Sequence, residues 1–330
     1  MHGLTRAGLV AALLVGSLVL PQRAAGQDDP DDRVGAAECC LPLLFPIGAR
    51  AVGLGNALTA RGGADALFVN PAGLAALDRD EFRIHNANTD IETSNTFGVA
   101  FGISTAGILA LSYRLVDYGT FTATGKGGEI TGEVRIIEHM LLSTFATQLG
   151  GGLAAGITYK IYQSRQSCSG FCEQPPFAAT THGIDFGVQY HPPLWKALQL
   201  GTSITHFGLP LQVINAEQTS PTPARVRAGA AYEVLHHFAA DSAVSIWLST
   251  DVAASWRQGV PATVGVGAEV IMDNTIFVRA GYASGGGRNA GAGVGLGLRY
   301  DRFDIGIARS FVDAGATDRD PFQITFSVAF

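Results

Sequence analysis

The sequence predicts an all-β chain that forms a transmembrane, up-and-down antiparallel barrel of about fourteen strands. Charged residues make up only 15% of the 330 residues, against about 25% in an average soluble domain, whereas 47% are hydrophobic. From about residue 80 onwards, hydrophobic residues alternate with polar or small ones. This period is typical of strands, and a chain so poor in charge is expected to expose one strand face to lipid.

The predicted strands are short and regularly spaced. About fourteen segments show the alternation, each near the 9–11 residues that a tilted transmembrane strand requires. They lie near residues 80–88, 96–104, 107–117, 134–148, 151–164, 180–191, 196–207, 224–236, 243–256, 260–272, 275–284, 289–300, 302–311 and 321–330. Short connections such as 104–106 alternate with longer ones such as 117–133, 164–179 and 208–223. Barrels with short periplasmic turns and long external loops show this alternation, and a soluble sandwich gives no reason for it.

The N-terminus has the pattern of a signal peptide. Arg6 precedes an apolar run over residues 7–20, and the small residues up to Gly26 give a cleavage site before Gln27. The run is shorter than the about 20 residues of a membrane-spanning helix, which disfavours an anchor. We therefore expect a signal peptide at 1–26, an N-terminal segment and hatch at 27–78, and the transmembrane barrel at 79–330.

Several function classes are disfavoured by the sequence. The net charge is -6 and no block of Lys or Arg occurs, which argues against a nucleic-acid partner. The sequence lacks a Gly-x-Ser-x-Gly motif, a nucleotide-binding loop in a strand–helix context and the paired cysteines of a zinc site. We expect no catalytic, cofactor-binding or metal site, so the chain is predicted not to be an enzyme and to carry no cofactor.

Charged residues on the polar face of the predicted strands should line the lumen, because charge in lipid is costly. They are Arg114, Lys160, Asp185, Arg227, Glu233, Asp251, Glu269, Arg279, Arg299 and Asp304. Their signs balance, which indicates an interior filled by its own ion pairs or a plug rather than an ion-selective pore. A register slip of one residue would invert this assignment.

The four cysteines suit an oxidising compartment. Cys168 and Cys172 lie in one predicted loop, where a local disulfide is expected. Cys39 and Cys40 are adjacent, so a bridge between them is strained and a longer-range bridge stays possible.

Residues 47–77 are rich in Gly and Ala and have weak periodicity. Small residues permit close backbone packing, and Asn70-Pro71 is a turn signal. Such a segment can fold into the lumen as a hatch; the alternative is a periplasmic segment that packs nowhere special. The residues of the hatch motif are Gly53, Gly55, Asn56, Asp65, Asn70, Pro71, Ala72 and Gly73.

The stretch GARAVGLGNALTARGGADALFVNPAGLA, residues 48–75, resembles the N-terminal signature of the PorV/PorQ family. That family belongs to the FadL-like (long-chain fatty acid transporter) group of outer-membrane barrels. Looser similarity continues through LSYRLVDYGTF, GGLAAGITYKIY, GIDFGVQYHP, GTSITHFG and VGVGAEVIMDNTIFVRAGY. The resemblance implies that Asn70, Pro71 and Ala72 belong to a hatch inside the barrel of a protein of the bacterial outer membrane.

The resemblance implies two functions. PorV-like members act in type IX secretion as carriers of exported proteins, and FadL-like members move hydrophobic molecules across the outer membrane. The predicted lumen of Gly, Ser, Thr and balanced charge favours a carrier or interaction partner in protein secretion. Transport of small hydrophobic molecules such as fatty acids is the alternative, and a structural barrel is a second one. The expected partners are outer-membrane lipid, the barrel assembly machinery, and either a secretion channel with exported proteins or a small hydrophobic molecule.

Phe322, Phe326 and Phe330 fall on one face of the last predicted strand, where an aromatic C-terminus can act as an assembly signal. Deletion of Phe330 should lower the yield of assembled barrel, measured by heat-modifiable gel mobility. Barrels that do assemble should unfold near the normal midpoint, because one lipid-facing ring contributes at most about 3–5 kcal/mol. A normal yield would leave these rings as ordinary members of an aromatic girdle.

Overall fold

The computed structural model describes residues 38–89, 92–172, 175–213, 219–237, 243–257, 260–284, 290–312 and 321–330. The signal peptide predicted for residues 1–26 lies outside these ranges. Among the described residues, no helix combines the length and apolar character needed to cross a bilayer.

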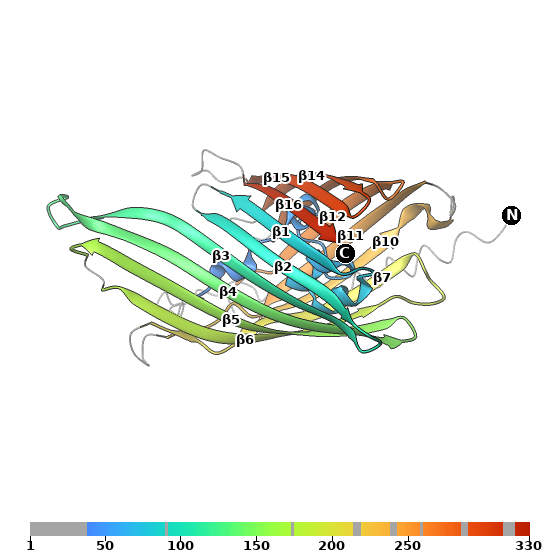
Figure 1. Ribbon diagram of the computed structural model, residues 1–330, viewed down its shortest axis with the longest axis horizontal. Coiled ribbons are helices and arrows are strands. Elements are labelled where there is room, and N and C mark those ends of the chain that lie inside the picture. The colour runs from blue at the N-terminus through green and yellow to red at the C-terminus, as the bar shows by residue number, and fades with distance from the viewer. Residues whose placement is uncertain are drawn as a thin grey trace, which may run out of the picture. The chain divides into compact units, whose positions relative to one another are not determined.

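Fourteen strands form one closed antiparallel barrel, which confirms the predicted fold class (Figure 1). They are β1 (Glu81–Asn88), β2 (Thr93–Ile103), β3 (Gly107–Thr124), β4 (Ile130–Gly150), β5 (Leu153–Gly170), β6 (Phe177–Tyr190), β7 (Leu198–Gly208), β10 (Arg225–Glu233), β11 (Val244–Ser255), β12 (Thr263–Met272), β13 (Ile276–Ser284), β14 (Gly291–Tyr300), β15 (Phe303–Val312) and β16 (Phe322–Ala329). β1 closes the barrel, because it pairs with β2 on one side and with β16 on the other. A separate hairpin is formed by β8 (Leu211–Gln212) and β9 (Thr219–Ser220), and η5 (Val234–His237) follows β10.

Alternate residues of each strand face outwards and inwards. On β16, the rings of Phe322 and Phe326 are exposed, whereas Gln323, Thr325 and Ser327 are buried. Apolar side chains therefore cover the outer surface and polar ones the inner surface, as a barrel in lipid requires.

The two ends of the barrel differ in their connections. The turns at residues 104–106, 151–152, 273–275 and 301–302 lie at the end where β1 begins and β16 finishes. We call this the turn end and the opposite one the loop end. Short turns of outer-membrane barrels face the periplasm, which orients the loop end outwards.

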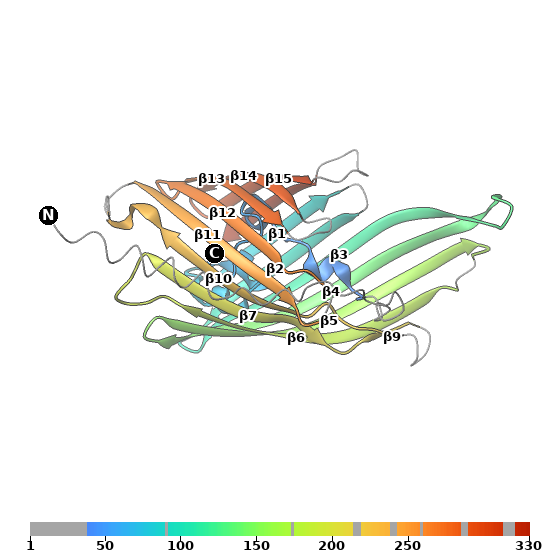
Figure 2. The ribbon, with the colours of Figure 1, turned by 180° about the vertical axis from the view of Figure 1, so that it is seen from behind.

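Strands β3 to β6 are longer than the others and extend further towards the loop end (green in Figures 1 and 2). The prediction of long connections at 117–133 and 164–179 is wrong, because most of these residues belong to strands. A register shift between Asp117 and Thr120 interrupts the pairing of β3 with β4. Such a bulge breaks the period of two, so the alternation in the sequence ends before the strand does.

Residues 38–77 lie inside the barrel, and we call them the inner segment (blue in Figure 1). It consists of turns and short helices: η2 (Leu41–Leu44), α2 (Ala49–Gly53), η3 (Ala64–Phe68) and η4 (Pro71–Ala76). The amide of Ala49 donates to Thr325 Oγ1 of β16 at 2.9 Å. The side chains of Leu54, Leu58 and Leu74 are fully buried.

Inward-facing glycines let the backbone of the inner segment touch the barrel wall. A Cβ atom added at Gly201 would lie 2.1 Å from the carbonyl oxygen of Thr59, and one at Gly281 would lie 2.3 Å from the carbonyl carbon of Leu54. We call the wall glycines whose added Cβ would lie less than 3 Å from a backbone or side-chain atom of the inner segment the glycine belt. They are Gly156, Gly187, Gly201, Gly229, Gly265, Gly267, Gly281 and Gly293.

The glycine belt predicts a strong positional dependence of Gly→Ala substitutions. Gly201→Ala should lower the free energy of unfolding by about 1–3 kcal/mol, because the added methyl group meets backbone atoms whose displacement is energetically costly. Gly183→Ala is the matched control, since its added Cβ would meet its nearest neighbour at 3.5 Å. Denaturant unfolding of the two purified barrels compares them. Equal stabilities would contradict the tight contact at the belt.

Candidate functional site

Asn70 fixes the course of the inner segment in the middle of the lumen. Its Oδ1 accepts a hydrogen bond from the amide of Ala72 at 3.1 Å and caps η4. Its Nδ2 donates to the carbonyl oxygens of Thr59 at 2.7 Å and Val188 at 3.1 Å. Pro71 follows at the first helical position, where its fixed φ suits a helix start. The Asn-Pro-Ala motif thus joins two parts of the inner segment to β6.

The glycines of the predicted hatch motif lie at close contacts. Gly55 has a φ of 58°, and an added Cβ would lie 2.6 Å from the carbonyl oxygen of Tyr282. A Cβ at Gly73 would lie 2.5 Å from Cβ of Ala66 in η3, and Gly53 packs against β13 and β14. These positions exclude a side chain on steric grounds.

Glu269 of β12 receives three arginines. Its carboxylate oxygens lie 3.1 Å from Arg50, 2.8 Å from Arg61 and 2.8 Å from Arg279. Arg50 and Arg61 belong to the inner segment, and the guanidinium of Arg61 also lies 3.9 Å from the ring centre of Trp247. A buried carboxylate needs such partners, because an unpaired charge in this environment is costly.

A second ionic contact joins the inner segment to β10 and β11. Arg227 lies 3.0 Å from Asp251, and it also donates to the carbonyl oxygen of Asn56 at 2.9 Å. The amide of Thr59 donates to the same Asp251 carboxylate at 3.0 Å. The Asn56 position of the predicted motif therefore contributes through its backbone.

Every one of the predicted lumen charges lies on an inward face. Further ion pairs are Lys160–Asp185 at 2.6 Å, Arg299–Asp304 at 3.0 Å, and Arg114–Glu92 at 3.6 Å. Glu233 is half-buried on β10 and acts electrostatically on Arg61. The partners Arg50 and Arg61 were not predicted from the sequence, although a charge in an otherwise small and apolar segment inside a barrel requires a counter-charge.

Asp65 of η3 pairs with Arg83 of β1 at 2.6 Å and lies 3.8 Å from His85. Burial alone would raise the pKa of the Asp65 carboxyl, but the nearby charges of Arg83, His85 and Arg50 lower the pKa to about 2. This carboxylate stays ionised at neutral pH and holds η3 to the wall.

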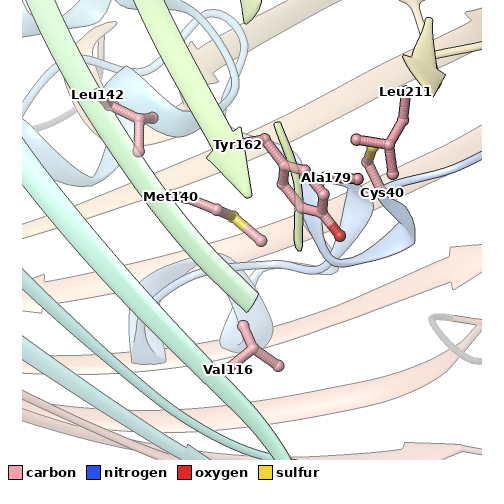
Figure 3. Close-up of a cluster of buried hydrophobic side chains, with 7 residues drawn as sticks. All are labelled: Cys40, Val116, Met140, Leu142, Tyr162, Ala179 and Leu211. Atoms are coloured by element: carbon pink, nitrogen blue, oxygen red, sulfur yellow. The ribbon is translucent and has the colours of Figure 1, made fainter. Parts of the chain in front are cut away.

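One part of the lumen towards the loop end is apolar, which the expected lining of Gly, Ser, Thr and balanced charge did not include. Its buried side chains form a cluster that we call the apolar pocket (Figure 3). They are Cys40, Val116, Met140, Leu142, Tyr162, Ala179 and Leu211. Four wall strands, β3 to β6, supply most of them, and Leu43 of the inner segment packs against the cluster. A cavity of about 40 Å³ lies beside it and is lined by Leu43, Met140 and Leu142.

Polar groups border the apolar pocket and have partners. Arg114 donates to the carbonyl oxygen of Pro42 at 2.8 Å, and Tyr118 donates to Glu138 at 3.2 Å. The bond from Arg114 holds η2 of the inner segment against β3, and the bond from Tyr118 joins β3 to β4.

Both cysteine pairs form disulfides. Cys168 and Cys172 are joined at the loop end of β5. Cys39 and Cys40 are joined to each other rather than to a distant cysteine. The amide of Cys39 donates to the carbonyl oxygen of Pro221, so this bridge lies where the inner segment meets the loop end. In the part of the chain that the structure describes, no group of three His, Cys, Asp or Glu side chains has the arrangement of a metal site.

No family model and no curated protein sequence matches this chain. Solved structures with the same fold include the toluene transporter TbuX of Ralstonia pickettii, with a TM-score of 0.56 at 10% identity over 86% of this chain and 98% of that one. The toluene transporter TodX of Pseudomonas putida gives 0.55 at 14% identity over 85% and 96%. A FadL homologue of Pseudomonas aeruginosa gives 0.53 at 12% identity over 87% and 99%. The chain thus has a FadL-like barrel fold, and with its apolar outer face it is a barrel of the bacterial outer membrane.

The Glu269 cluster predicts how firmly the inner segment is held. Glu269→Gln leaves three buried arginines without their shared counter-charge and should cost about 3–5 kcal/mol of unfolding free energy. Trypsin should then cleave faster after Arg50 and Arg61 in the folded barrel.

The matched control is Asp304→Asn, which removes a pair whose arginine side chain is 38% exposed. Such a pair contributes about 0–1 kcal/mol. The attachment would be disproved if both variants unfolded and were cleaved like the unsubstituted protein.

Proposed function

We propose that this barrel transports small hydrophobic molecules across the outer membrane and binds them first in the apolar pocket. The observation that carries the proposal is a cluster of apolar side chains on lumen-facing positions near the loop end. A water-filled pore has a polar lining, whereas a site for hydrophobic ligands is lined by apolar and aromatic side chains.

The structures with the same fold support this alternative over protein secretion. They include two toluene transporters and CymD, described as a monoaromatic hydrocarbon channel. A carrier of exported proteins would use its outer surface and has no need of an apolar lumen. The secretion role implied by the resemblance to the PorV/PorQ family gains no comparable support from the described residues.

The charges around the pocket favour an uncharged ligand. Arg114 and Lys160 line the adjacent cavity, and their charges are matched by Glu92 and Asp185. A carboxylate ligand would have to compete with these buried partners, at a substantial cost. Small aromatic or aliphatic molecules without charge therefore fit better than fatty acids.

The pocket is filled by the protein itself in this structure. The cavity of about 40 Å³ is far smaller than the about 300–1,000 Å³ of a typical small-molecule site. Leu43 and Cys40 of the inner segment occupy the space beside Met140 and Tyr162. We infer that a ligand enters by displacing η2 from this cluster, which couples binding to movement of the inner segment.

Substitution of Met140 tests the pocket. Met140→Gln keeps the size of the side chain but places a polar amide in the cluster, and should weaken binding about tenfold, equivalent to about 1.4 kcal/mol. Met140→Leu conserves apolar volume and is the control, with an expected change of less than about twofold. Binding of N-phenyl-1-naphthylamine, an uncharged aromatic fluorophore, is measured with the barrel in lipid nanodiscs. The proposal fails if the unsubstituted barrel shows no saturable binding, or if both variants bind equally.

A further inference from the structure

Three cavities inside the barrel share lining residues. The first is the cavity of about 40 Å³ beside the apolar pocket. The second, of about 20 Å³, lies between η3 and strands β1 to β3. The third, of about 460 Å³, is at the turn end, where Asn274 and Asp301 line it. Phe68 lines the first and second cavities, and Ala64 and Arg83 line the second and third. Asp65 lines the first and third cavities, so η3 borders all three cavities between the pocket and the turn end.

The inner face of β3 borders the first two of these cavities and the apolar pocket. Its successive inward residues, from the loop end to the turn end, are Val116, Arg114, Ser112 and Ala110. Val116 belongs to the apolar pocket and Arg114 lines the first cavity. Ser112 and Ala110 line the second cavity. A ligand that moves along this strand meets progressively smaller side chains after Arg114.

The inner segment is attached unevenly around the wall. On the far side, the carbonyl oxygen of Val69 accepts a hydrogen bond from Ser203 of β7 at 2.6 Å. Within the described ranges, no residue of η3 hydrogen-bonds to β2 or β3. Contact there is made with small apolar side chains, including Ala100 and Ala110. Separation of η3 from β2 and β3 thus breaks no hydrogen bond, whereas separation of the adjoining Val69 from β7 breaks one.

Phe68 stands where the first cavity meets the second. Its ring packs against both the apolar pocket and the cluster that contains Leu67 and Ala110. It meets the ring of His85 edge-on, with centroids 5.9 Å apart. A change in the position of this one ring would join the two cavities, because the wall beside it carries small residues there, Gly98 and alanines.

We propose that a hydrophobic ligand passes from the apolar pocket to the turn end between η3 and the inner faces of β2 and β3, with Phe68 as the gate. The proposal rests on the proposed function and adds the route and the gating residue to it. The ion pair between Asp65 and Arg83 holds η3 at β1 and marks the point where the route reaches the third cavity.

Two substitutions with opposite effects test the route. Ala110→Leu fills the second cavity and should lower uptake of N-phenyl-1-naphthylamine by intact cells about tenfold, while nanodisc binding stays within about twofold. Phe68→Ala should raise uptake several-fold. Ala253→Leu is the control, because Ala253 is also a buried inward alanine but lines none of the three cavities. Heat-modifiable mobility verifies that each variant is folded.

The outcomes separate the route from the proposed function. Normal uptake by folded Ala110→Leu, with binding intact, would overturn the route and leave the function standing. If the unsubstituted barrel neither binds nor admits the fluorophore, the proposed function fails and the route fails with it. Ion conductance in planar bilayers tests the gate by a second measurement. Raised conductance of Phe68→Ala relative to Ala253→Leu supports a gate at Phe68, and equal conductance overturns it.

Discussion

Close contact between the backbone of the inner segment and the glycine belt is the constraint on which the rest of this structure depends. Because the belt has no side chains, carbonyl and amide groups of residues 38–77 come within reach of wall side chains such as Gln189 and Asp251. The same contact excludes water from much of the lumen, so charges there must be paired within the protein. The glycine belt and the ionic clusters are two consequences of one packing arrangement.

This arrangement also divides the lumen into unlike sides. From β5 to β14 the wall is held to the inner segment by glycine contacts, and β11 and β12 add the carboxylates of Asp251 and Glu269, which bind its amides and arginines. Towards β2 and β3, η3 is packed against alanines without a hydrogen bond, and the inner segment is fixed there through η2, where Arg114 donates to Pro42. An inner segment that is fixed firmly on one side and packed more loosely around η3 on the other can shift without leaving the lumen, as the proposed transport requires.

The strands and their faces were predictable because period-two alternation is a local property of the sequence. The length of β3 to β6 was not, since the bulge after Asp117 interrupts that period. The apolar pocket escaped prediction for a different reason: Met140 and Leu142 look like lipid-facing residues until the register shows that they point inwards. The ionic partners could not be matched either, because Arg50 and Glu269 lie 219 positions apart. Charges could be assigned to the lumen, but their pairing depends on how the inner segment crosses it.

Enclosure of the inner segment imposes an order on biogenesis. Its bond from Ala49 to Thr325 spans 276 positions, and the seam between β1 and β16 joins the first and last strands of the barrel. Once β1 and β16 have paired, a folded inner segment can no longer enter the lumen between them. The inner segment is synthesised before the strands, so it must stay associated with the incomplete wall until β16 pairs with β1. Such distant pairing is intrinsically slow, because residues at opposite ends of the barrel sequence must meet before the wall around the inner segment is complete.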